Sequence, residues 1–364
     1  MTAVARPDTT STPDGRKVRR TVAHSIASAH LGRFGLLALL VLVIIIFSVL
    51  KPTEFATWAN FTQTADQQAS VMIGGLAVML PLLTAEIDLS VAANISFANI
   101  VLSVLTTNDH MSVGLGVVLA IVASTAVGLG NGLIVDRLQV TSFVATLGTG
   151  TLLGGLGLAV SHSLDILTVP SSVTTIVRTK VWGLPLSVVY AVVAMAIVGM
   201  VLRYLPVGRK IRAVGANPRA AVLTGIRPSL YRVASFTVGG ALAGIAGVVI
   251  TGQLGSATAA GSADTLLLPI FAAVFLGSTA FTPGRPNVLG LFVAALFLAF
   301  VSSGLVMMGA PAWESPLING AALITAVALS SWALRLRARR FRAEQLKQID
   351  RDDQDQAGEA ATAV

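Results

Sequence analysis

The stretch LPVGRKIRAVGANPRAAVLTGIRPSLYR, residues Leu205–Arg232, is polar and basic, yet long apolar runs flank it on both sides. Within it, Asn217 and Pro218 are typical of a helix start, because Asn caps free N–H groups and Pro needs no N–H at the first helical position. Arg219–Thr224 can continue the turn, and Gly225 is a natural stop. The stretch therefore predicts a helix of about two turns, or ~10 Å at the α-helical rise, between two membrane spans.

So short a helix is not stable alone in water. Its small residues Ala220 and Ala221 suit docking into a groove on a partner protein. The alternative is an ordinary cytoplasmic loop, which is basic because such loops usually are.

The composition excludes an ordinary soluble protein. Of 364 residues, 54% are hydrophobic and only 12% charged, with a mean hydropathy of +0.80. A soluble domain carries about 25% charged residues, so we predict an all-α polytopic membrane protein. The net charge of +8 then reflects orientation in the lipid bilayer and not nucleic-acid binding. With no cysteines and four scattered histidines, the chain offers no disulfide, thiol or metal-ligand set.

About ten apolar runs approach the ~20 residues that a bilayer needs. They are approximately 31–50, 68–83, 87–105, 113–135, 143–161, 184–205, 233–252, 266–281, 287–308 and 316–334. The second run is short and contains Pro81, so the sequence allows a tilted, a broken or a re-entrant helix there.

The distribution of charge predicts the orientation. With a cytoplasmic N-terminus and ten spans, the C-terminus is cytoplasmic too, and of the 25 Lys and Arg only Lys51, Arg178 and Lys180 fall outside. We expect a disordered basic cytoplasmic tail at 1–30, a membrane domain at 31–334 that includes the basic loop 206–232, and a cytoplasmic tail at 335–364.

Two blocks of four spans hint at an inverted repeat. One begins near Ile73–Leu76 (IGGL) and the other near Val238–Ala241 (VGGA), and the predicted topology makes them enter the membrane from opposite sides. Opposed repeats of this kind build the midplane sites of many transporters.

The segment Thr84–Ser90 (TAEIDLS) is the clearest acidic cluster beside a span. Asp88 and Ser90 can each cap the helix that follows. A carboxylate inside the bilayer costs roughly 2.5–3.5 kcal/mol or more, so Glu86 and Asp88 need a partner or water. We favour a cap at the cytoplasmic edge; the alternative is a gate, or a contact with the basic loop.

Uncharged polar side chains within the spans can hydrogen-bond a polyhydroxylated substrate, or equally a neighbouring helix. The candidates for a substrate path are Asn94, Asn99, Asn131 and Thr146. No Lys, Arg, Asp or Glu lies in the middle of a predicted span, which weakens a proton relay, an ion-coupled carrier or a voltage sensor.

Motifs for nucleotide chemistry or hydrolysis are missing from the sequence. It has no GxxxxGK[ST] phosphate loop, no HExxH and no paired catalytic carboxylates. We therefore predict neither an enzyme nor a cofactor. If the protein moves a substrate uphill, we expect the energy to come from another subunit, because charges for ion coupling are lacking.

The sequence resembles a known family, the permease subunits of bacterial ABC sugar importers of the ribose type. These are related to branched-chain amino-acid permeases. The matching segments are Glu86–Val91 (EIDLSV), Asn131–Val135 (NGLIV), Phe143–Thr149 (FVATLGT), Gly208-Arg209, Gly215–Ala221 (GANPRAA) and Gly225-Ile226. The last three resemble the coupling loop that seats on the ATPase. This implies the ATPase-coupling residues Gly208, Arg209, Gly215, Asn217, Ala220, Ala221 and Gly225.

The resemblance implies import of a monosaccharide similar to ribose, xylose or galactose through the bacterial inner membrane. Its implied partners are a second permease subunit, identical or paralogous, two ABC ATPase subunits, and an extracytoplasmic sugar-binding protein. The chain departs from the family pattern at Ala85-Glu86 and at Thr282–Asn287. A nucleoside, an autoinducer or a branched-chain amino acid therefore stays open as the substrate, as does an ion-coupled secondary carrier.

Overall fold

The computed structural model describes residues 34–259, 264–282, 284–311 and 313–328. The predicted tails at 1–30 and 335–364 lie outside the described residues. The described part is all-α, as predicted, apart from a short hairpin of β1 (Lys180–Val181) and β2 (Leu184–Pro185).

Every apolar run of the sequence overlaps a helix within the described residues. The helices are Phe34–Leu50, α2 (Trp58–Leu83), α3 (Val91–Thr107), α4 (Val113–Arg137), α5 (Ser142–Val160), α6 (Ser171–Arg178), α7 (Leu186–Tyr204), α8 (Pro206–Ala216), α9 (Pro218–Leu223), α10 (Pro228–Leu254), α11 (Asp264–Gly277), α12 (Val288–Met307) and residues 314–328. Six of them are long and apolar enough to cross a membrane, namely α2, α4, α5, α7, α10 and α12.

Helix α2 differs from its predicted form. It is one continuous helix of 26 residues, about 39 Å long, that starts ten residues before the apolar run. Hydropathy missed this start because the first third of α2 is polar. Thr57 caps it by accepting a hydrogen bond from the N–H of Asn60 at 3.1 Å. Pro81 falls in the last turn and does not break the helix.

The longer α2 places one acidic residue, Asp66, inside a candidate membrane span. The expectation that spans carry no inner charge is therefore wrong at this position. The Asp66 carboxylate accepts hydrogen bonds from Ser187 of α7 and, at 3.2 Å, from Gln253 of α10. It is thus held between three helices, as a carboxylate away from water must be.

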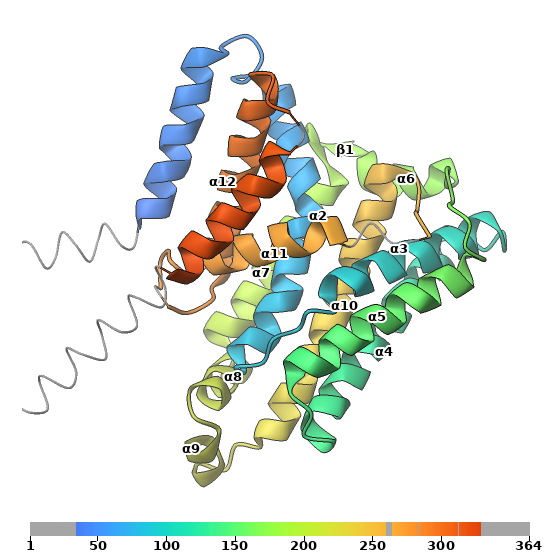
Figure 1. Cartoon of the computed structure of the whole chain (residues 1–364), viewed down its shortest axis with the longest axis vertical. Helices are drawn as coiled ribbons and strands as arrows, with labels where there is room; N and C mark the ends of the chain where they lie inside the picture. The colour runs from blue at the N-terminus through green and yellow to red at the C-terminus, as the bar shows by residue number, and fades with distance from the viewer. Residues whose placement is uncertain (1–33, 260–263, 283, 312, 329–364) are drawn as a thin grey trace, which may run out of the picture.

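The order of elements repeats across the chain. The two longest helices, α2 and α10, cross in the centre and run in opposite directions (Figure 1). Each is followed in the element order by a short helix (α3 or α11) and a long one (α4 or α12). The centre is apolar and tightly packed: Ile73, Leu76 and Met79 of α2 are fully buried among residues that include Ile270 and Leu291.

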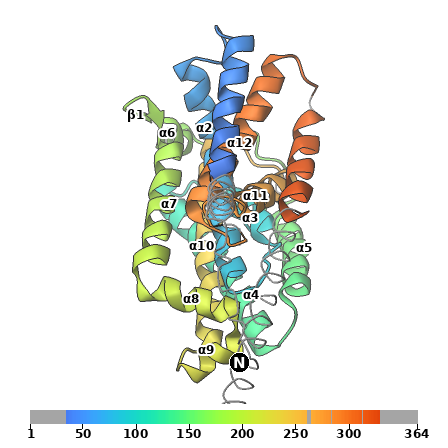
Figure 2. The ribbon, with the colours of Figure 1, turned by 90° about the vertical axis from the view of Figure 1, so that its left-hand side faces the viewer.

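The two ends of the bundle differ in character. Helices α8 and α9 lie at one end, which we call the basic end, and α6 with the hairpin lies at the other, which we call the hairpin end (Figure 2). Trp58, where α2 begins, belongs to the hairpin end, and α2 runs from there towards the basic end (Figure 1).

Candidate functional site

Helix α9 is the predicted docking helix, and its ends are built as the sequence indicates. The side-chain Oδ1 of Asn217 accepts a hydrogen bond from the N–H of Ala220 at 3.1 Å, and Pro218 opens the helix. After Thr224 the chain turns at Gly225, whose φ of +77° is a conformation that glycine adopts without strain. The predicted cap and stop are confirmed.

The helix before it, α8, was not predicted. Pro206 stands in its first turn, Ile211 and Val214 are buried, and the basic side chains of Arg209, Lys210 and Arg212 are exposed. Apolar residues three apart are the signal of an amphipathic helix. We interpreted the stretch as a loop because it is polar and basic.

Two glycines of α8 allow backbones to touch. A Cβ atom at Gly208 would lie 2.2 Å from the carbonyl oxygen of Leu202 on α7. A Cβ atom at Gly215 would lie 2.1 Å from the carbonyl oxygen of Leu83, the last residue of α2. Because real Cβ atoms do not approach oxygen this closely, α8 can rest on the end of α2 only with glycine at this position.

The side chains of α9 divide between two faces. Ala221 is only 4% exposed and packs towards the body of the protein. Val222 and Leu223 are 56% and 89% exposed, and Ala220 is exposed as well. We call Ala220, Val222 and Leu223 the docking face. An apolar side chain as exposed as Leu223 marks a surface that a partner can cover.

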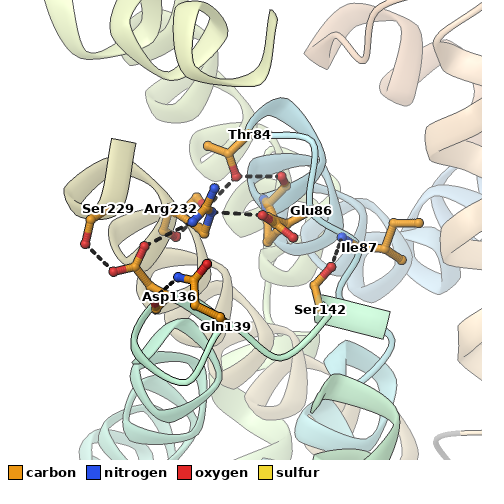
Figure 3. Close-up of polar contacts among 10 residues, drawn as sticks. Thr84, Glu86, Ile87, Asp136, Gln139, Ser142, Ser229 and Arg232 are labelled. Carbon is orange, nitrogen blue, oxygen red and sulfur yellow. Dashed lines mark hydrogen bonds and ion pairs between the residues drawn. The ribbon is translucent and has the colours of Figure 1, made fainter. Parts of the chain in front are cut away.

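Arg232, in the second turn of α10, joins this region to the Thr84–Ser90 segment. Its Nε lies 2.8 Å from Oε1 of Glu86, and its Nη1 lies 3.1 Å from Oδ1 of Asp136 at the end of α4 (Figure 3). The three side chains are 19%, 17% and 8% exposed, respectively. The Nε–H makes no aligned hydrogen bond, so the contact with Glu86 is an ion pair, whereas the contact with Asp136 is also a hydrogen bond.

Neither Arg232 nor Asp136 was among the predicted site residues. Both stand at the edges of predicted spans, where a charge is usual and attracts no notice. Ser229 also donates to Asp136, which adds a second contact between α10 and α4 (Figure 3). The sequence shows only that Arg232, Glu86 and Asp136 lie at the edges of predicted spans. It does not show that their side chains meet.

The backbone of the Thr84–Ser90 segment is held by hydroxyl groups of α5. The N–H of Ile87 donates to Oγ of Ser142 at 3.1 Å (Figure 3), and the N–H of Leu89 donates to Oγ1 of Thr146 at 3.0 Å. These bonds satisfy backbone donors that no helix or strand provides for. Thr146, a candidate for the substrate path, is thus buried against this segment.

Asp88 and Ser90 do not cap α3, so the prediction that they do is wrong. Ser90 occupies the N-cap position, but its side chain accepts no hydrogen bond from the helix. Instead its hydroxyl donates to Oδ1 of Asp88 at 2.6 Å, and its N–H donates to the same atom at 2.9 Å. Asn131 of α4 donates to the Ser90 hydroxyl at 2.8 Å and accepts from Thr149 at 2.6 Å. A chain of polar contacts therefore ties the segment to α4 and α5.

Asn94 and Asn99 of α3 are buried and bonded to other helices. Nδ2 of Asn94 donates to the carbonyl oxygen of Ser124 at 3.1 Å. Nδ2 of Asn99 donates to Oγ1 of Thr251 at 2.9 Å and to the carbonyl oxygen of Ser256 at 3.2 Å. All four substrate-path candidates thus bond other parts of the chain, and their contact with a substrate stays a prediction.

Apolar helices that can span a bilayer, and a basic helix pair seated on an interior polar segment, define a multi-pass integral membrane protein with a junction at its basic end. The chain belongs to the family described as the branched-chain amino acid transport system / permease component, whose model matches residues 60–327. The predicted resemblance to ABC sugar permeases of the ribose type is confirmed.

Three relatives illustrate the match. The probable ABC transporter permease protein YphD of Escherichia coli K12 is 29% identical over 86% of this chain and 93% of its own length. The D-allose transport system permease protein AlsC of the same strain is 27% identical over 82% of this chain and 91% of its own. The ribose import permease protein RbsC of Bacillus subtilis is 28% identical over 80% and 90%. No solved structure matches the chain.

A permease component is not an enzyme, and ATP is hydrolysed by a separate subunit of the transporter.

Proposed function

We propose that this chain is the membrane-spanning permease subunit of an ATP-driven ABC importer that translocates a monosaccharide handed over by an extracytoplasmic binding protein. The observation that carries the proposal is the contact of Gly215 with the end of α2, because it seats the predicted coupling helices where the Thr84–Ser90 segment begins. A gate was the alternative to a cap for this segment, and we call it the gate segment. The sugars in the relatives' names, among them D-allose and ribose, support the substrate class.

The junction suggests how force reaches the gate. An ATPase subunit that covers the docking face would move α9 and α8 together, because Asn217 ends one and caps the other. Movement of α8 would press on the Gly215–Leu83 contact, while movement of α10 would act on Glu86 through Arg232. Both routes end in the Thr84–Ser90 segment. The change is rigid-body motion of packed helices, one of the usual forms of a two-state switch.

The proposed topology has ten spans, both termini in the cytoplasm and the basic end facing the cytoplasm of a bacterium, in its inner membrane. The excess of Lys and Arg at this end supports the orientation. The repeated element order of α2–α4 and α10–α12 supports an inverted repeat, in which the site lies near the midplane. A second permease, identical or paralogous, and two ATPase subunits complete the proposed assembly.

The substrate alternatives are a nucleoside, an autoinducer and a branched-chain amino acid, and the mechanistic alternative is an ion-coupled carrier. Asp66 is the residue that a carrier would need, since it is ionisable and lies within a candidate span. Its hydrogen bonds to Ser187 and Gln253 favour a structural role instead.

The test is transport in proteoliposomes that contain the permease, its ATPase and its binding protein. We expect the proteoliposomes to accumulate a monosaccharide when ATP is supplied on the side of the membrane that holds the ATPase. A non-hydrolysable ATP analogue should give no accumulation. The permease without its partners should accumulate nothing. Concentrative uptake by the lone chain under a proton or sodium gradient would overturn the proposal.

A further inference from the structure

The polar first third of α2 contains three glutamines without partners. Gln63 and Gln67 are exposed and Gln68 is half-buried, and none of their side-chain amides makes a hydrogen bond within the described residues. Gln67 lies nine residues after Trp58, or about 14 Å along the helix from the hairpin end. An amide in hydrocarbon without a hydrogen bond costs several kcal/mol, so these side chains call for water or a polar ligand.

The glutamines line two adjoining cavities. One, of about 320 Å³, lies between α2 and α12 and includes Gln63, Gln67, Gln68 and Ser302 in its wall. The other, of about 200 Å³, shares Gln67, Gln68 and Ser302 and extends to Asn319 in the helix of residues 314–328. The larger cavity alone falls at the lower end of the range for small-molecule sites.

The wall of this space is fixed by a neighbouring amide. Asn60 donates to the carbonyl oxygen of Phe55 at 2.9 Å, and its Oδ1 accepts from Thr64 at 3.2 Å and from Ser303 of α12 at 2.9 Å. The Asn60 side chain thus uses one Nδ2–H and accepts two hydrogen bonds at Oδ1, and it links α2 to α12. The side-chain amides of Gln63, Gln67 and Gln68, by contrast, have donors and acceptors available for a ligand.

The chemistry of the lining selects a class of ligand. Each amide both donates and accepts, which matches the hydroxyl groups of a sugar. Val306 and Met307 add an apolar side against which the C–H groups of a sugar ring can lie. No described Lys, Arg, Asp or Glu lines either cavity. An amino acid would bring two charges into this space without a counter-charge, which is costly away from water.

We propose that the cavity lined by Gln63, Gln67, Gln68 and Ser302 is an entry site that receives one neutral monosaccharide at the hairpin end. The proposal rests on the proposed function and deepens it, since it names the residues that first hold the sugar. A sugar bound here lies on the far side of the molecule from the coupling helices. It can therefore bind before ATP drives any movement.

The absence of cysteine from the chain makes a direct test possible. Gln67→Cys introduces the sole thiol, and a membrane-impermeant methanethiosulfonate is added from outside to spheroplasts that contain the complete transporter. The matched control is Val122→Cys on α4, where Val122 is 57% exposed in an apolar helix face. Ribose, allose, arabinose, fructose, galactose and xylose are tested as protectants at high millimolar concentration, and leucine serves as a charged comparison.

We expect the Gln67→Cys thiol to react and the Val122→Cys thiol not to react. At least one of the six sugars should slow the reaction, and leucine should not. A thiol at position 67 that is as unreactive as the control, because lipid or a second copy covers it, would overturn the proposal. So would a reactive thiol that none of the sugars protects, or that leucine protects best.

A second measurement separates this proposal from the proposed function. Labelling needs no ATP, whereas transport does. Normal ATP-driven sugar uptake after complete labelling at position 67 overturns the entry site and leaves the permease function intact. Sugar protection without ATP-driven uptake by the unmodified transporter keeps the site and overturns the importer.

Discussion

At the scale of single residues, Gly215 is the position where the coupling helices and the gate segment meet without any side chain between them. A Cβ atom there would lie 2.1 Å from the carbonyl oxygen of Leu83. Neither backbone can yield easily, since α8 is buried at Ile211 and Val214 and α2 runs through the core. A displacement of α8 would therefore act directly on the end of α2.

Gly215→Ala should therefore impair transport. The added methyl group forces α8 off the end of α2, and overpacking of this sort costs about 1–3 kcal/mol. The measurements are thermal unfolding in detergent and ATP-driven uptake. Gly130→Ala on α4 is the control, because a Cβ atom there meets nothing within 4 Å; it should leave uptake unchanged and raise stability by up to about 1 kcal/mol. Wild-type uptake by Gly215→Ala would refute direct contact as the route.

Arg232 and Glu86 should show energetic coupling. We expect a double-mutant cycle of Glu86→Gln and Arg232→Gln, followed by unfolding, to give an interaction of about 0.5–3 kcal/mol, as for residues in one network. Arg232→Gln alone should be the more harmful change, because it leaves both Glu86 and Asp136 without a cation. Strictly additive effects would mean that the ion pair contributes nothing to the junction.

Asp66 provides a test of ion coupling. Asp66→Asn keeps an oxygen that can accept from Ser187 and Gln253 but can no longer exchange a proton. Under the importer proposal, ATP-driven uptake should persist, with the same response to external pH as the wild type. Loss of uptake with normal expression, or loss of its pH response, would revive the carrier alternative.

At the scale of elements, the sequence predicted helix α9 but not α8 or the start of α2, and each outcome has a physical reason. The cap at Asn217 and the stop at Gly225 are local backbone chemistry, so they can be recognised without tertiary structure. The two failures concern polar helices. Hydropathy records apolar content, and both α8 and the first turns of α2 are helical because of packing partners that lie far away in the chain.

The candidate site was predicted in the same uneven way. Its segments were identified, since Thr84–Ser90 and the basic stretch both stand out in the sequence. Their contacts were not, because the pairing of Arg232 with Glu86 and Asp136 joins residues 146 and 96 positions apart (232 − 86 and 232 − 136). A single sequence considered by itself does not record which distant residues are neighbours in the fold.

The division of α9 into two faces gives a prediction for this element. Leu223→Arg places a charge on the docking face, where the side chain is 89% exposed, so it should weaken ATPase binding and leave folding intact. Ala221→Arg buries a charge at a position only 4% exposed, so it should displace α9 and destabilise the protein as well.

The measurements are co-purification of the ATPase and thermal unfolding. Leu167→Arg is the control, because Leu167 is 80% exposed at a distance from α9 in the sequence. It should affect neither property. Full ATPase binding by Leu223→Arg would show that the exposed side of α9 is not where the ATPase docks.

At the scale of the whole molecule, the orientation in the membrane can be tested with two exposed positions at opposite ends. Trp182 in the hairpin is 96% exposed, and Leu223 in α9 is 89% exposed. In the cysteine-free chain, Trp182→Cys should react with an impermeant thiol reagent on intact spheroplasts, and Leu223→Cys only after permeabilisation. The reverse pattern would invert the topology and with it the direction of transport.

The sharing of Arg232 between two carboxylates has one further consequence. Glu86 belongs to the connection that is proposed to move, and Asp136 belongs to a long helix. If the connection swings away, the guanidinium stays neutralised by its other anion, and the departing carboxylate reaches solvent at the membrane edge. Opening then leaves no unpaired charge in the low-dielectric interior. It therefore avoids the free-energy cost of several kcal/mol that breaking an isolated buried ion pair imposes.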